Sequence, residues 1–208
     1  MRARSRLTPT WNPANPDQLA MACLQEKVGF SMLIVGLDGT IVHDFKIKDH
    51  WVDDLSFSPD GQTLAYMSGD TTVSTSAGHI VTVPADGSAQ PVPLTDEFTD
   101  RGPSWSPNGE KIVFYREVPS DPSRHTIFMM SADGSDQAPV GESTRDDASP
   151  GWSTDGEKIA FVSNRDREDL SQYRYFLMDS DGANLRRLNP DDSSMAFSTP
   201  AWGPRVTK

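Results

Sequence analysis

The chain lacks the features that mark disulfide-linked, metal-binding and membrane-spanning proteins. It has one cysteine, Cys23, in 208 residues, which excludes an internal disulfide and any paired-cysteine metal or redox motif. Its longest apolar run, residues 29–37, is far shorter than the roughly 20 residues of a membrane-spanning helix, so no membrane insertion is expected. The basic N-terminus is followed by a polar, proline-rich stretch instead of an apolar one, so no signal peptide is predicted in this chain.

Positive charge and catalytic motifs are scarce as well. The 19 lysines and arginines are outnumbered by 30 aspartates and glutamates, for a net charge of −11. Such a surface repels phosphate backbones, so nucleic acid is not expected as a partner. The sequence contains no GxSxG elbow, HExxH pair, Walker loop or GxGxxG loop, and serine and aspartate are too common here to indicate a triad. We therefore predict a protein that is not an enzyme and that needs no cofactor.

In place of these motifs the chain has an internal repeat of about 47 residues. Aromatic residues recur at steps of 46, 48, 47 and 50, and Asp-Gly pairs recur at steps of 48, 47 and 48. An apolar triplet keeps its place between these two markers in the first four copies. The recurring aromatic residues are Trp11, Phe57, Trp105, Trp152 and Trp202. Three markers that share one period and one order indicate a repeat architecture.

Each repeat has the pattern of four short strands. In the third copy, β-branched and aromatic runs at residues 103–106, 111–116, 126–131 and 137–140 are separated by turns that contain asparagine, aspartate and glycine. Asn-Gly and Asp-Gly pairs tolerate the positive φ angle that tight hairpins require. The pattern predicts an all-β fold, a β-propeller of four-stranded antiparallel blades with four full repeats and a partial fifth.

The repeat resembles a known family at the level of individual residues. The clearest copy is PGWSTDGEKIAFVSNRD at residues 150–166, followed by YFLMDSDGANLRRL at residues 175–188. Residues 56–68 and 104–116 are close to it, whereas the first copy has NPANPDQ where the SPDG turn belongs. This pattern is similar to the TolB-type propeller repeat. The resemblance implies propeller blades over nearly the whole chain, on a scaffold shared by TolB, tricorn-type and prolyl-oligopeptidase-like peptidases and some lyases.

The repeats are expected to form one propeller domain, residues 1–208. Their predicted bounds are residues 9–53, 54–102, 103–149 and 150–198, with a partial blade strand at residues 199–208. Residues 3–8 resemble an outermost strand and residues 199–204 an innermost one. Three interpretations stay open: a fragment of a larger propeller, a compact four-bladed ring with a surplus strand, and a chain completed by a second chain. An open arc of blades exposes apolar sheet faces, which favours self-association.

The connections between repeats carry the candidate binding residues. Strand order places the short SPDG and Asp-Gly turns on one face and the variable loops on the other, where binding usually lies. An exposed tryptophan beside a histidine in one of these acidic loops would add a contact residue. The candidate partner-binding residues are Asp49, His50, Trp51, Asp53, Asp54, Asp96, Glu97, Asp100, Asp146, Asp147, Asp191 and Asp192. They form either an acidic rim for a basic partner or Ca²⁺, or solvated charge that keeps the protein soluble.

Three functional hypotheses follow. The first is a non-catalytic TolB-like scaffold that binds a protein or peptide, basic in character, through its acidic loop-bearing face. The second is the propeller portion of a larger enzyme, controlling access to a catalytic domain, as the resemblance to peptidase propellers implies. The third is a ligand-binding or calcium-binding propeller, although no loop has the DxDxDG spacing of a calcium site. The sequence does not specify the compartment, and the resemblance to TolB allows a periplasmic or extracellular location.

Overall fold

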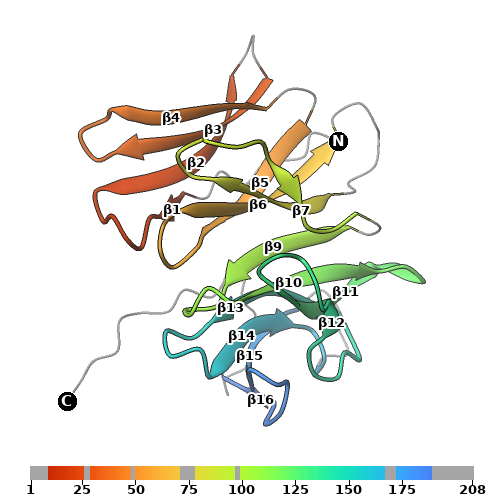
Figure 1. Ribbon diagram of the computed structural model, residues 1–208. Coiled ribbons are helices and arrows are strands. Elements are labelled where there is room, and N and C mark those ends of the chain that lie inside the picture. The colour runs from red at the N-terminus through yellow and green to blue at the C-terminus, as the bar shows by residue number, and fades with distance from the viewer. Residues whose placement is uncertain are drawn as a thin grey trace, which may run out of the picture. The chain divides into compact units, whose positions relative to one another are not determined.

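The computed structural model describes residues 9–25, 29–47, 50–70, 78–96, 99–166 and 172–188 (Figure 1). These residues form sixteen strands and no helix, arranged in four separate four-stranded antiparallel sheets. The predicted all-β fold of four-stranded repeats is therefore confirmed. The strand-like segments predicted at residues 3–8 and 199–208 lie outside the described residues.

Each sheet is one blade, and its strands follow chain order from one edge to the other. Blade 1 contains β1 (Thr10–Trp11), β2 (Gln18–Gln25), β3 (Gly29–Gly36) and β4 (Ile41–Ile47). Blade 2 contains β5 (His50–Phe57), β6 (Thr63–Asp70), β7 (His79–Pro84) and β8 (Val92–Pro93). Blade 3 contains β9 (Asp100–Trp105), β10 (Lys111–Val118), β11 (Asp121–Ser131) and β12 (Ala138–Pro139). Blade 4 contains β13 (Asp147–Trp152), β14 (Lys158–Ser163), β15 (Arg174–Asp179) and β16 (Arg186–Arg187).

The turn between the first two strands is held by side chains that the repeat preserves. In blade 2, the Ser58 hydroxyl donates to Asp60 Oδ1 at 2.6 Å and accepts from the Thr63 backbone N at 2.9 Å. The corresponding serine hydroxyl donates to Asn108 Oδ1 at 2.7 Å in blade 3 and to Asp155 Oδ1 at 2.6 Å in blade 4. In blade 1, Asn12 replaces the serine, and its Oδ1 accepts from two backbone N–H groups of the turn. This substitution explains why the first copy departs from the SPDG pattern and still forms the turn.

In blades 2, 3 and 4 the innermost strand begins earlier than the sequence predicts and contains a residue in the left-handed region. Three residues before the aromatic position, φ is +53° at Asp54, +59° at Gly102 and +53° at Ser149. In blades 2 and 4 the strand register shifts at this residue, as in a β-bulge, and pairing resumes on the far side. The predicted start of the third copy, Pro103, accordingly lies inside β9, which begins at Asp100.

Because Ser149 is not glycine, its conformation has a measurable cost. We expect Ser149→Gly to raise the free energy of unfolding by about 1 kcal/mol, since glycine adopts positive φ without a Cβ penalty. Ser149→Ala is the matched control, because it removes the hydroxyl and keeps the Cβ. Chemical denaturation of both variants measures the difference. Equal stability of the glycine and alanine variants would contradict this account.

By contacts the chain divides into two compact units, Met1–Pro103 and Ser104–Lys208, and each has its own core. In the first unit, the core joins Ala20, Ala22, Met32 and Ile34 of blade 1 to Phe57, Leu64, Tyr66, Val81 and Val83 of blade 2. In the second unit, it joins Val113 and Ile127 of blade 3 to Trp152, Ile159, Phe161, Phe176 and Met178 of blade 4. Both cores follow one rule. The side of a blade that carries the aromatic residue of its first strand, called here the aromatic face, packs on the opposite face of the preceding blade.

Candidate functional site

Antiparallel pairing gives each blade two distinct ends. The turn end carries the connections from first to second strand and from third to fourth strand, and the loop end carries the other connections. All of the predicted partner-binding residues belong to connections at loop ends or to the strand residues beside them. Four of them, Asp49, Glu97, Asp191 and Asp192, lie outside the described residues. Of the other eight, six lie in strands and two, Asp96 and Asp146, lie in connections.

The prediction that these residues lie in the variable loops between repeats is wrong for six of the eight described ones. The strands that contain them are β5 for His50, Trp51, Asp53 and Asp54, β9 for Asp100, and β13 for Asp147. The bulge at the left-handed residue is the physical reason, because it allows the innermost strand to continue past the point where the sequence pattern breaks. Asp96 and Asp146 do lie in connections.

Asp146, directly before β13, joins blade 3 to blade 4. Its Oδ1 accepts hydrogen bonds from the backbone N and the ring Nδ1 of His125 in β11, both at 2.8 Å. The Tyr173 hydroxyl donates to Oδ2, and the Asp146 backbone N donates to Asn164 Oδ1 at 3.1 Å. Because a carboxylate only accepts, Nδ1 of His125 carries the proton in this contact. We name the set formed by Asp146, His125, Tyr173 and Asn164 the Asp146 clasp.

The clasp shifts the pKa values of Asp146 and Tyr173 in opposite directions. Burial opposes ionisation of Asp146, but hydrogen bonds from His125 and Tyr173 outweigh it and lower the pKa of the carboxyl below its ordinary value. Burial and the contact with Asp146 raise the pKa of the Tyr173 hydroxyl, so the phenol stays protonated at neutral pH. Among the described residues, no hydroxyl or thiol nucleophile hydrogen-bonds the second ring nitrogen of His125. What the described residues show is a histidine-aspartate pair that connects two blades.

Asp147 is held inside blade 4 in a similar way. Its Oδ2 accepts from Arg165 Nη2 at 2.8 Å, and the Arg165 guanidinium lies 5.2 Å and 5.3 Å from the ring centres of Phe161 and Phe176. Arg165 Nε also donates to Ser163 Oγ at 3.1 Å. A carboxylate that is 2% exposed and paired with a stacked guanidinium stabilises the blade.

Burial therefore divides the predicted acidic rim. Asp100, Asp146 and Asp147 are 0%, 6% and 2% exposed, so their carboxylates are turned into the blades. Asp96 is exposed, and Asp53 and Asp54 are half-buried. The Asp54 carboxylate accepts from the Gly102 backbone N at 3.2 Å. Among the described candidates, the acidic residues that are not fully buried thus lie at the loop end of blade 2.

At the loop end of blade 2, a tryptophan lies over a glycine. Trp51 pairs with Gly69 across the sheet, and a Cβ at Gly69 would lie 2.3 Å from the indole ring. The indole therefore rests on the strand and is half-buried. The prediction that Trp51 lies in an acidic loop is wrong, because Trp51 belongs to β5, which begins at His50. His50, exposed at the start of the strand, pairs with Asp70 at the end of β6.

The turn end of the second unit contains a hollow that the sequence analysis did not predict. Its volume is about 570 Å³. Lining residues include Glu110, Lys111, Trp152, Asp155 and Asp181. Within one of these turns, Asp155 Oδ1 accepts from the Ser153 hydroxyl and from the Glu157 backbone N. The sequence signal for the hollow is the recurrence of carboxylates at turn positions of neighbouring copies.

The described residues lack two further kinds of feature. They contain no group of three or more His, Cys, Asp or Glu side chains placed to hold a metal ion. They also contain no helix long and apolar enough to cross a membrane.

Comparison with known proteins relates this geometry to a family. No protein-family model matches the chain, and no curated protein sequence matches it. Among solved structures, putative TolB from Agrobacterium tumefaciens is similar at a TM-score of 0.66 and 26% identity, over 83% of this chain and 61% of that chain. TolB from Acinetobacter baumannii is similar at 0.67 and 20% identity, over 90% and 44%. The tricorn protease is similar at 0.57 and 15% identity, over 80% and 17%.

This chain thus spans 61% of the length of the Agrobacterium protein and 44% of the Acinetobacter protein. The repeat markers, the four-stranded sheets and the packing rule between neighbouring blades agree with these similarities. The chain has the TolB-like β-propeller fold, in the form of four consecutive blades.

Proposed function

We propose that this chain is a non-catalytic TolB-like propeller scaffold that binds a basic segment of a protein or peptide at the loop end of blade 2. One observation carries the proposal. At this loop end, His50 and Asp96 are exposed and the indole of Trp51 is half-buried, whereas Asp146 and Asp147 of blade 4 are buried in internal contacts. The proposal also rests on the structural similarity to TolB.

The chemistry of this loop end suits a lysine or arginine side chain. An indole face attracts a cation, and a nearby carboxylate forms a charge-assisted hydrogen bond with it. Asp53, half-buried two residues after Trp51, and the exposed Asp96 supply carboxylates at this end of the blade. The net charge of −11 would also steer a basic segment toward the protein at low ionic strength.

The test is fluorescence anisotropy with a labelled nona-arginine peptide, with nona-glutamate as the negative probe. We expect the double variant Asp53→Asn and Asp96→Asn to weaken nona-arginine binding by about tenfold, because two carboxylates at the contact are lost. Binding to the native chain should fall as salt is added, and nona-glutamate should not bind.

The matched control removes the same charge from turn ends. Asp17 and Glu157 are exposed there, and no side-chain hydrogen bond is recorded for either carboxylate. Asp17→Asn with Glu157→Gln should change the affinity by less than about twofold, because only long-range attraction is reduced. Equal weakening by the two double variants would show that the charge acts only through solvation and steering, and the proposed site would be withdrawn.

A second candidate is the propeller portion of a larger enzyme, which the similarity to the tricorn protease favours. That similarity, at 15% identity, concerns the fold. The coding sequence on both sides of this chain separates the two candidates. A neighbouring α/β-hydrolase domain would favour the enzyme, and further repeats of the same kind would favour the binding scaffold.

A further inference from the structure

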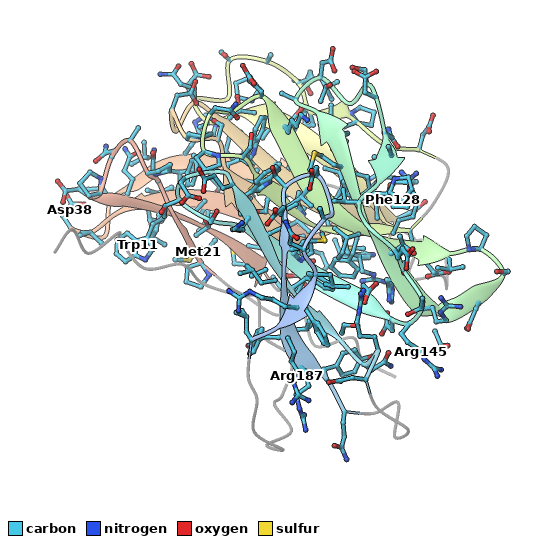
Figure 2. All side chains as sticks on the ribbon, turned by 90° about the horizontal axis from the view of Figure 1, so that it is seen from below. Trp11, Met21, Asp38, Phe128, Arg145 and Arg187 are labelled. Atoms are coloured by element: carbon cyan, nitrogen blue, oxygen red, sulfur yellow. The ribbon has the colours of Figure 1, made fainter. Side chains whose placement is uncertain are left out.

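The first turn of blade 3 contains an asparagine where the same turns of blades 2 and 4 contain an aspartate. Asn108 corresponds to Asp60 and Asp155. In all three turns, Oδ1 of this residue accepts from the serine hydroxyl two residues earlier at 2.6–2.7 Å and from the backbone N two residues later at 3.0–3.2 Å. Phe128 marks blade 3 and Arg187 marks blade 4 in Figure 2. One turn geometry therefore accommodates either side chain.

Asn108 differs from the other asparagines of the chain in the residue that follows it. The chain has six asparagines, and Asn108 is the one that precedes a glycine. Three others precede proline, which has no backbone N–H, and Asn164 and Asn184 precede arginine and leucine. The backbone N of a following residue can attack the side-chain amide carbon of asparagine, and a side chain on that residue hinders the attack. Glycine has no side chain, so Asn108 is the most susceptible of the six.

This reaction needs only water as a second reactant. The Gly109 backbone N bonds to Cγ of Asn108, and its proton leaves with the side-chain nitrogen as ammonia. The product of this step is a succinimide ring. Water then opens the ring at one of its two carbonyl carbons. Opening at Cγ gives an aspartate, and opening at the backbone carbonyl gives an isoaspartate, whose backbone is longer by one methylene group.

The folded turn keeps the two reacting groups engaged elsewhere. Gly109 N donates to the Ser106 backbone O at 2.9 Å, and the φ of Gly109 is +74°. The Asn108 side chain accepts two hydrogen bonds at Oδ1, and its Nδ2 donates to Glu110 Oε2 at 2.7 Å. Attack on Cγ therefore requires local opening of the turn. Asn108 is exposed, so water reaches the opened turn.

Conversion to aspartate changes one contact of the turn. Both hydrogen bonds at Oδ1 can persist, as they do in blades 2 and 4, but the donor to Glu110 is lost. In blade 4 a glutamate, Glu157, follows Asp155 at the same spacing and is exposed. A glutamate two residues after the aspartate is thus compatible with the turn. Asn108 and Glu110 both line the hollow at the turn end of the second unit, so the reaction adds one negative charge there.

We propose that Asn108 is a site of spontaneous deamidation, which converts the first turn of blade 3 to the aspartate form of blades 2 and 4. Local opening of the turn sets the rate. Aspartate restores the turn, because its Oδ1 occupies the position of the amide oxygen. Isoaspartate does not restore it, since the added methylene group lies between residues whose hydrogen bonds fix the turn.

Intact-mass measurement and peptide mapping during incubation at mildly alkaline pH test the site. We expect the native chain to gain the mass of one amide-to-acid conversion, located at Asn108. Asn164 and Asn184 are internal controls and should remain amides, because each precedes a residue with a large side chain. A synthetic peptide of residues 104–112 should react at least about tenfold faster than the folded chain, since it has no turn to open. Ser106→Ala removes one hydrogen bond from Oδ1 and should also react faster than the native chain.

The variant Asn108→Asp supplies the aspartate product directly. It should keep the native far-ultraviolet circular dichroism, shift the urea midpoint by no more than about 0.3 M, and gain no mass at this position during the same incubation. A native chain that keeps its amide after the peptide has fully reacted would overturn the proposal. Equal reaction of Asn108, Asn164 and Asn184, or a native rate equal to that of the peptide, would overturn it as well. A larger loss of stability in Asn108→Asp would show that the turn rejects the product.

Discussion

Replacing Gly182 by alanine is expected to lower the free energy of unfolding by about 3 kcal/mol. Two causes combine. Gly182 has a φ of +87°, where a Cβ is strained, and that Cβ would lie 2.4 Å from the backbone N of Gly141 in blade 3. A backbone atom cannot step aside as a flexible side chain can, so the two blades must separate locally.

Gly39 separates these two causes. It occupies the same Asp-Gly turn in blade 1, with a φ of +85°, and nothing lies within 4 Å of its Cβ position. Gly39→Ala should therefore cost only the conformational part, about 1 kcal/mol. Urea denaturation of both variants measures the difference. If they lose the same stability, the contact between the two turns contributes nothing and the packing of blade 4 on blade 3 needs another explanation.

Asp146→Ala is expected to lower the free energy of unfolding by about 3 kcal/mol. The substitution removes the acceptor for the His125 backbone N, its ring Nδ1 and the Tyr173 hydroxyl in one step. A buried polar group left without a partner lowers the free energy of unfolding by more than the net contribution of the hydrogen bond that it lost. Asp133→Ala, at an exposed turn of blade 3, is the control for loss of one carboxylate and should cost about 1 kcal/mol or less.

The Asp146 clasp also predicts a pH dependence with a definite sign. The pKa of the Asp146 carboxyl is lower in the folded chain than its ordinary value of 3.8. Its ionised form therefore stabilises the fold fully above the unfolded pKa, and this contribution is lost as pH falls through the lower folded value. The stability difference between the native chain and Asp146→Asn should be constant from pH 6 to about pH 5 and shrink below about pH 4. A difference that grows on acidification would contradict the charge state assigned to the clasp.

The two variants probe different parts of one seam. Gly182 and Gly141 meet where turns of blades 3 and 4 come together, and Asp146 joins the same blades through His125. The two contacts share no residue, so their effects should add in the double variant to within about 0.5 kcal/mol.

Local sequence was sufficient to predict the blades. The second and third strands were placed closely because their β-branched and aromatic runs are bounded by glycine turns, as at residues 111–116 and 126–131. The turns were predicted from their Asn-Gly and Asp-Gly pairs, and the structure adds a serine and a carboxylate that hydrogen-bond within the turn. Because these interactions join residues that are close in sequence, the residue types that form them recur with the 47-residue period.

The starts of the innermost strands were not predictable in this way. Asp54 and Ser149 adopt positive φ, where sequence favours glycine, and only Gly102 carries the expected signal. The strands continue because the neighbouring second strand supplies backbone partners on both sides of the bulge. The loop boundaries drawn from the pattern were therefore three or more residues too late.

Composition and period were enough to predict an acidic, all-β repeat protein, because each blade forms from contacts between neighbours in the chain. The TolB type of the blades came from the resemblance of the repeat to a known family, which the similar structures support. Which acidic residues remain available to a partner depended instead on contacts across blades. Asp146 meets His125 over 21 residues and Tyr173 over 27, and Asp147 meets Arg165 over 18. A sequence pattern shows the charge of a residue, but its burial is decided by side chains that only folding brings to it.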